Sequence, residues 1–74
     1  MLNLREVGKR CKRFRLKNGY LQIHVAADTG YSVENVSAFE TGRNDNYRIL
    51  LWYLSHGMKP ENLFESGEKY GADV

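Results

Sequence analysis

Residues 22–40 read QIHVAADTGYSVENVSAFE, two helix-length segments on either side of a glycine. The first segment, Gln22 to Thr29, is expected to end at Gly30, because glycine readily adopts the left-handed conformation that closes a helix. Ser32 is a good N-cap, so a second helix is expected from Val33 to Glu40. Two short helices joined in this way predict a helix-turn-helix unit, whose second helix enters the major groove of DNA. On this pattern alone, a pair of helices inside an ordinary bundle is an alternative.

An amphipathic helix is expected before the unit. Its apolar positions fall three and four residues apart, at Leu4, Val7, Cys11 and Phe14. Most of the neighbouring basic residues lie off that stripe, which is the pattern of a helix with one face in the core. The spacing predicts a helix over about residues 2 to 17, stopped at Asn18-Gly19.

Two further helices are expected after the unit. Residues 41–46 are dense in turn-forming residues and predict a loop. The segment 47–56 is apolar on nearly every side, which predicts a fourth helix buried on nearly every side. Pro60 suits the first turn of a helix, so a short fifth helix is expected over residues 60–65.

The composition favours one small domain with a helical core. The chain has 74 residues, of which 42% are hydrophobic and 27% charged, so it is neither disordered nor long enough for two domains. One cysteine excludes an internal disulfide, and with two separated histidines it excludes a zinc site of the usual spacing. We expect residues 1–66 to form the domain and residues 67–74 a flexible tail.

The positive charge is concentrated at the start of the chain. Residues 1–17 carry seven basic and one acidic residue, a net charge of +6, whereas residues 18–74 carry four basic and eight acidic residues, a net charge of −4. This asymmetry predicts an anionic partner, such as nucleic acid or a membrane surface, near the first helix; a solvated helix face is the alternative. With no signal-peptide core and no run of roughly 18 apolar residues, the protein is expected to be soluble and cytoplasmic.

Several runs of the sequence together match one known type of domain. The matching runs are Val7 to Arg15, Gly19 to Gln22, Val25-Ala26, Gly30 to Ser32, Val36-Ser37, Phe39 to Arg43 and, after a gap, Leu54 to Phe64. In this order they resemble the Cro and cI repressor type of helix-turn-helix domain, also called the xenobiotic-response-element family. The resemblance implies an all-α, compact five-helix bundle of the lambda-repressor-like type, without a sheet.

The resemblance also implies structural roles for three residues. In the family, an arginine late in the first helix pairs with a glutamate that ends the third helix, and the matching residues are Arg15 and Glu40. Both stand beside phenylalanines, where a charge is otherwise unexpected. We therefore expect a salt bridge that holds the third helix in place. Ala26 matches the position where the second and third helices cross closely.

The resemblance places the DNA contacts on and beside the third helix. Gln22 matches a position that braces a phosphate, and an ordinary helix-start residue is its alternative. The groove-facing positions match Ser32, Val33, Glu34, Asn35, Ser37 and Ala38. Glu34 could accept from a cytosine amine or simply complement the helix dipole. Arg43 and Asn44 match phosphate contacts, with a solvated loop as the alternative, and Arg10 is expected to add to the positive field of the first helix.

The sequence departs from the family pattern in four places. Leu21 stands where a Ser or Thr cap opens the second helix, and the loop after Gly42 is about two residues short by our alignment. The third helix has no Arg, Lys or Gln, which predicts modest specificity or readout through DNA shape. His56 replaces an apolar residue and is expected to be a helix-end histidine rather than a ligand.

Two classes of function remain after enzymes are set aside. The sequence has no phosphate-cradling glycine loop and no nucleophile paired with a base, and Cys11 lies on an apolar stripe, so neither catalysis nor a cofactor is expected. The first class is a small sequence-specific regulator of transcription, a repressor or controller of the kind found in phage immunity, restriction-modification or antitoxin systems. The second is a repressor-fold module that binds another protein, which the acidic, arginine-free third helix favours.

A homodimer is expected in the first case. The fourth helix carries more leucines than one small core can cover, and the short last helix can continue the same apolar surface. The expected interface is made of Leu50, Leu51, Leu54, Leu63 and Phe64. A two-fold dimer would place its third helices about 34 Å apart and require a short palindromic operator.

Overall fold

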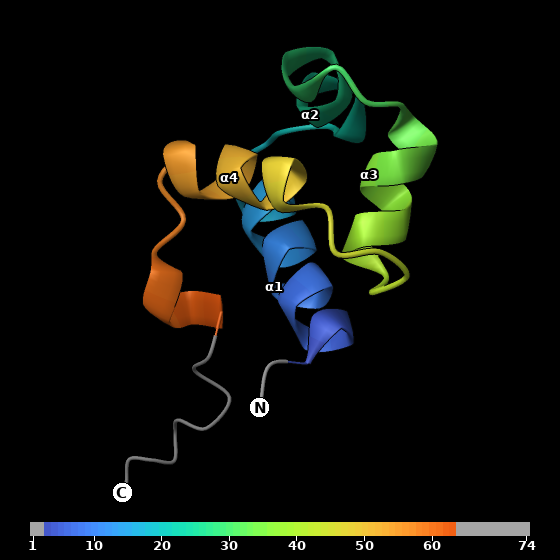
Figure 1. Cartoon of the computed structure of the whole chain (residues 1–74). Coiled ribbons are helices and arrows are strands. Elements are labelled where there is room, and N and C mark those ends of the chain that lie inside the picture. The colour runs from blue at the N-terminus through green and yellow to red at the C-terminus, as the bar shows by residue number, and fades with distance from the viewer. Residues whose placement is uncertain (1–2, 64–74) are drawn as a thin grey trace, which may run out of the picture.

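Figure 1 shows the computed structural model, in which residues 3–63 are described. The elements are α1 (Leu4–Lys17), α2 (Gln22–Thr29), α3 (Val33–Glu40), α4 (Tyr47–Ser55) and the 3-10 helix η1 (Pro60–Leu63). Over these residues the chain is helical and contains no strand, as the sequence predicts. The expected bounds of α2 and α3 are those observed.

The last element differs from the expected fifth α-helix. It is a single 3-10 turn of four residues, in which the Asn62 N–H donates to the Lys59 carbonyl at 2.9 Å. Such i to i−3 bonds have poorer geometry than those of an α-helix, and they hold short turns of this kind. Phe64 and the expected tail, residues 67–74, lie outside the described residues.

Local hydrogen bonds set where the helices begin. The side chain of Asn3 accepts from the Glu6 N–H at 3.1 Å, so α1 starts at Leu4. At α2 the missing cap is replaced from inside the helix, because the N–H of Leu21 donates to Nδ1 of His24 at 2.9 Å. This bond is the half of a capping box in which a side chain in the first turn accepts from the N-cap N–H. The other half needs a polar side chain at the N-cap, which Leu21 does not have.

α1 runs through the middle of the molecule. It lies between α3 and η1 and contacts both of them as well as α4, and α2 packs on α3 and α4 (Figure 1). The core is built around the fully buried ring of Tyr53, which stacks on Phe39 at 6.0 Å and meets Trp52 edge to face at 5.1 Å. The buried set is Val7, Cys11, Val25, Ala26, Val36, Phe39, Ile49, Trp52, Tyr53, Met58 and Leu63.

The apolar surface expected at a dimer interface is smaller than the sequence suggests. Leu63 is 9% exposed and belongs to the core, so the prediction that it extends an exposed patch is wrong. Leu50 and Leu54 are half-buried against the same core. Leu51 is the leucine of this group that stays open, at 53% exposure, and Tyr47 lies one turn before it at 63%. α4 is therefore buried on one side only.

Gly8 marks the closest approach of α1 to α3. A Cβ atom at this position would lie 2.4 Å from the Phe39 carbonyl oxygen and 2.6 Å from that of Glu40. Real Cβ atoms do not approach backbone atoms so closely. The absence of a side chain at Gly8 is thus what allows the end of α3 to rest on α1.

We expect Gly8→Ala to destabilise the domain by about 2 kcal/mol, since the clash is with backbone that cannot rotate away. Helix propensity alone predicts the opposite sign, a gain of about 1 kcal/mol. Urea unfolding followed by circular dichroism measures the difference. Lys12→Ala, on the exposed side of the same helix, is the control and should change stability by less than about 0.5 kcal/mol. A Gly8→Ala protein as stable as the wild type would contradict this packing.

Candidate nucleic-acid interface

A buried ion pair holds the C-terminal end of α3. Arg15, on α1, donates from Nε to Oε2 of Glu40 at 2.8 Å and from Nη2 to Oε1 at 3.1 Å. Both side chains are almost wholly buried, with 6% and 1% of their surface exposed. The salt bridge implied by the resemblance is therefore present, in the two-point geometry that gives arginine and carboxylate their strongest contact.

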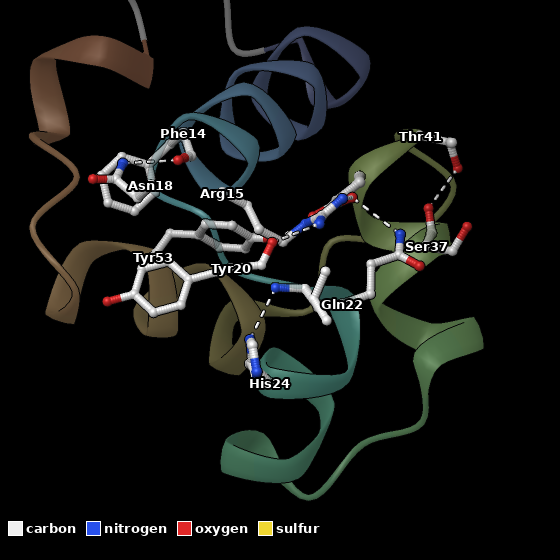
Figure 2. Close-up of polar contacts among 11 residues, drawn as sticks. Phe14, Arg15, Asn18, Tyr20, Gln22, His24, Ser37, Thr41 and Tyr53 are labelled. Atoms are coloured by element: carbon white, nitrogen blue, oxygen red, sulfur yellow. Dashed lines mark hydrogen bonds and ion pairs between the residues drawn. The ribbon is translucent and has the colours of Figure 1, made fainter.

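Two further side chains donate to the same carboxylate. Gln22 donates from Nε2 to Oε1 of Glu40 at 3.2 Å, and the Tyr53 hydroxyl donates to Oε2. The remaining guanidinium nitrogen of Arg15, Nη1, donates to the Tyr20 carbonyl at 3.1 Å, so Arg15 and Gln22 converge from two helices (Figure 2). We call Arg15, Gln22, Glu40 and Tyr53 the carboxylate network. A buried carboxylate is tolerated because its lone pairs are satisfied in this way.

The pKa values of two members of the network, Arg15 and Tyr53, are raised. The hydrogen bond to Glu40 raises the pKa of Arg15, so the guanidinium stays charged. Burial, and then the bond to Glu40, raises the pKa of the Tyr53 hydroxyl, so it remains a donor. Burial also raises the pKa of the Cys11 thiol to about 12, with the charge of Glu40 adding to the rise, which leaves this cysteine unreactive.

Gln22 has a role that the sequence did not indicate. Its amide nitrogen, the group that could donate to a phosphate, faces inward to Glu40. The structure therefore gives Gln22 a positioning role between α2 and α3. The backbone N–H groups at the start of α2 point outward from the helix N-terminus, where such groups can donate to an anion.

The outer face of α3 is open. Ser32, Val33, Glu34 and Asn35 are exposed, and Ser37 and Ala38 are half-buried. Ser32 acts as the expected N-cap, because its Oγ accepts from the Asn35 N–H at 3.2 Å. Figure 1 shows α3 at the right edge of the molecule, with α1 and α2 to its left. The groove-facing positions implied by the resemblance thus lie together on one accessible surface.

In the loop after α3, one residue is open to solvent and the next is held by hydrogen bonds. Arg43 is exposed, and its Nε donates to Oγ1 of Thr41 at 2.9 Å. Asn44 is half-buried; its Oδ1 accepts from the Asn46 N–H at 3.2 Å, and its Nδ2 donates to the Asn35 carbonyl at 3.5 Å. Arg43 keeps the surface position expected of a phosphate contact, whereas the contacts of Asn44 fold the loop back onto α3.

Arg10, expected to add to the positive field of the first helix, lies on the η1 side of α1. Its side chain is only 12% exposed and turns toward η1, where Nη1 donates to the Asn62 carbonyl at 3.5 Å. Nη2 lies 3.7 Å from Oε1 of Glu6 on the same helix. The helical position of Arg10 directs it to the side of α1 that faces η1.

A different arginine of α1 approaches the end of α3. A Cβ atom built on Gly42 would lie 2.6 Å from the Cα atom of Arg5, so Arg5 rests against the turn that follows α3. Lys9 and Lys12 follow Arg5 at four- and three-residue steps and share its exposed flank. Sequence reasoning missed Arg5, because only the packing of α1 on Gly42 brings the two together.

A polar cluster lies between α4 and α2, and the sequence did not indicate it either. The indole Nε1 of Trp52 donates to Oδ2 of Asp28 at 2.8 Å and so ties α4 to α2. His56 is the C-cap of α4; its ring stacks on Trp52 at 3.9 Å and its Nδ1 lies 2.8 Å from the Trp52 carbonyl. This agrees with a helix-end histidine.

Among residues 3–63, no group of three potential metal ligands lies together. In the same range, no helix has the length and apolar character needed to cross a bilayer. No family model, curated protein or solved structure matches the chain.

Removing either charge of the carboxylate network should destabilise the domain strongly, by about 3–5 kcal/mol, because the other charge is left buried. We expect the double variant Arg15→Ala/Glu40→Ala to lose less than the sum of the single variants in urea unfolding. Tyr53→Phe removes one donor to Glu40 without removing a charge and should cost about 1.5–3 kcal/mol, which keeps the test readable if the alanine variants do not fold. A coupling energy within about 0.5 kcal/mol of zero would show that Arg15 and Glu40 act independently.

Proposed function

We propose that this chain is a small DNA-binding regulator of transcription that places α3 in the major groove. The observation that carries the proposal is that one part of α3 is anchored and another part is exposed. Its C-terminal end is fixed by the carboxylate network, and its outer face, from Ser32 to Asn35, is exposed. A helix that is held rigidly and presented outward by a preceding helix is what major-groove recognition requires.

The charges around α3 support contact with phosphates. Arg43 follows α3 on the surface, and Arg5 stands against the same turn, with Lys9 and Lys12 continuing its flank. These cations are separated from the base-facing residues, so they would position the protein on the DNA backbone without reading sequence. The N–H groups that begin α2 would add a further contact.

The side chains on the outer face of α3 support modest base readout. Val33 is 39% exposed and could pack on a thymine methyl group, while Asn35 and Ser37 could bond base edges. α3 has no arginine, lysine or glutamine, the residues that make the commonest bidentate base contacts. Part of the specificity would then come from DNA shape.

A symmetric dimer would complete this function. Leu51 and Tyr47 are exposed one turn apart on α4, with the half-buried Leu50 and Leu54 beside them. This patch is the part of the expected interface that stays open within residues 3–63. Dimerisation through it would predict a palindromic operator with half-sites about one DNA turn apart.

A repressor-fold module that binds protein is the second candidate. Glu34 is exposed on the outer face of α3, where an acid would repel a phosphate backbone. An acidic, arginine-free surface of this kind suits a basic protein partner. The experiment below separates the two candidates.

The test is binding of the full chain to a fluorescent duplex of random sequence at several salt concentrations, followed by selection of the sequences that bind best. We expect the logarithm of affinity to fall with the logarithm of salt, with a slope of about −0.9 for each phosphate contacted. Arg43→Ala or Arg5→Ala should weaken all sequences alike and flatten the slope by about one. Val33→Ala, Glu34→Gln or Ser37→Ala should instead change which sequences are selected.

Lys59→Ala is the matched control, since it removes one exposed charge on the η1 side of the molecule and should leave DNA binding unchanged. Weak binding without sequence preference, unaffected by changes at Val33, Glu34 and Ser37, would contradict the regulator. If those same changes abolished binding to a defined protein from the native host, the module would be the better description.

A further inference from the structure

A pocket of about 420 Å³ lies on the side of α1 that faces away from α3. Figure 1 shows α1 between α3 and η1, and this pocket opens on the η1 side. Its lining includes Arg10, Arg13, Phe14, Lys17, Met58 and Asn62. Cations of α1 therefore lie both beside the end of α3 and at this pocket.

The pocket combines an apolar floor with a basic rim. Met58 is buried and Phe14 is half-buried against the core, whereas Arg13 and Lys17 are exposed beside them. Among residues 3–63, none of those lining the pocket is acidic. Arg10 is held at the inner edge by Glu6 and the Asn62 carbonyl and adds its charge to the rim. A ligand that fits this pocket carries negative charge together with an apolar group.

The spacing of the cations favours an extended ligand over a small ion. Arg10, Arg13 and Lys17 span eight residues of α1, a distance of about 10 Å along the axis. One phosphate or carboxylate group cannot reach charges spread over that length. Alternate side chains of an extended peptide repeat every ~6.7 Å, so two acidic side chains on one face of a peptide can meet two of these cations.

We propose that this pocket binds an acidic peptide segment of another protein. One aromatic or aliphatic side chain of the segment would rest on Phe14 and Met58, and flanking carboxylates would pair with Arg13 and Lys17. Exposed ion pairs alone contribute little, so the apolar anchor is what makes the contact specific. The pocket and α3 lie on opposite sides of α1, so this binding does not depend on the proposed DNA binding.

The probe is a short acetylated, fluorescent peptide in which glutamates flank one central phenylalanine, titrated with the full chain. Arg13→Glu/Lys17→Glu reverses two charges at the rim, and Arg5→Glu/Lys12→Glu reverses two on the flank of the same helix that lies beside α3. We expect the first pair to weaken peptide binding at least about tenfold and the second pair by less than about twofold. Arg13→Gln/Lys17→Gln should give an intermediate loss and avoids placing acids at the helix C-terminus.

Peptide and DNA controls complete the test. Replacing the phenylalanine of the peptide by alanine, or its glutamates by glutamines, should weaken binding, and inorganic phosphate should compete only through ionic strength. Equal losses from both charge-reversed pairs would reduce the effect to general electrostatic attraction and overturn the proposal. Absence of peptide binding by a folded wild-type chain would also overturn the proposal. Loss of duplex DNA binding in Arg13→Gln/Lys17→Gln would overturn it too, because it would assign the rim to nucleic acid instead. Failure of the proposed DNA binding alone would leave the peptide result unchanged.

Discussion

The buried carboxylate of Glu40 is the constraint on which the arrangement of the helices depends. A charge in a protein interior is costly unless its hydrogen bonds are made, and here the partners come from α1, α2 and α4. Glu40 ends α3, so satisfying this one group fixes the orientation of α3 against the other three helices. Gly8 lets the same end of α3 approach the backbone of α1. The outward direction of the opposite face of α3 follows from these contacts.

Local features of the sequence were enough to predict α2 and α3, because Gly30 and Ser32 act on the backbone next to them. The Arg15–Glu40 pair was expected from the family resemblance, and its other partners were not. Gln22 and Tyr53 join the carboxylate only after three helices pack, and helical spacing alone does not say which neighbour Arg10 meets. The burial of Leu63 and the place of Arg5 likewise depend on contacts between distant segments.

The positive charge of the molecule is concentrated in α1, and the basic residues of this helix border two different neighbours. One flank, from Arg5 to Lys12, adjoins the end of α3, and the other, from Arg10 to Lys17, borders the pocket beside η1. The buried stripe between them is occupied by Val7, Cys11 and Arg15. Under the two proposals, a single helix would offer phosphates and an acidic peptide different cations.

Amide hydrogen exchange, read helix by helix, tests most directly whether Glu40 holds α3 in place. The comparison is between Glu40→Gln and a core variant of similar global stability, such as Ile49→Ala, at a buried position of α4. We expect Glu40→Gln to lower protection of the α3 amides well before those of α1 and α4, while Ile49→Ala lowers protection evenly. Uniform loss of protection across the four helices in Glu40→Gln, as in the control, would contradict a specific anchoring of α3 by this carboxylate.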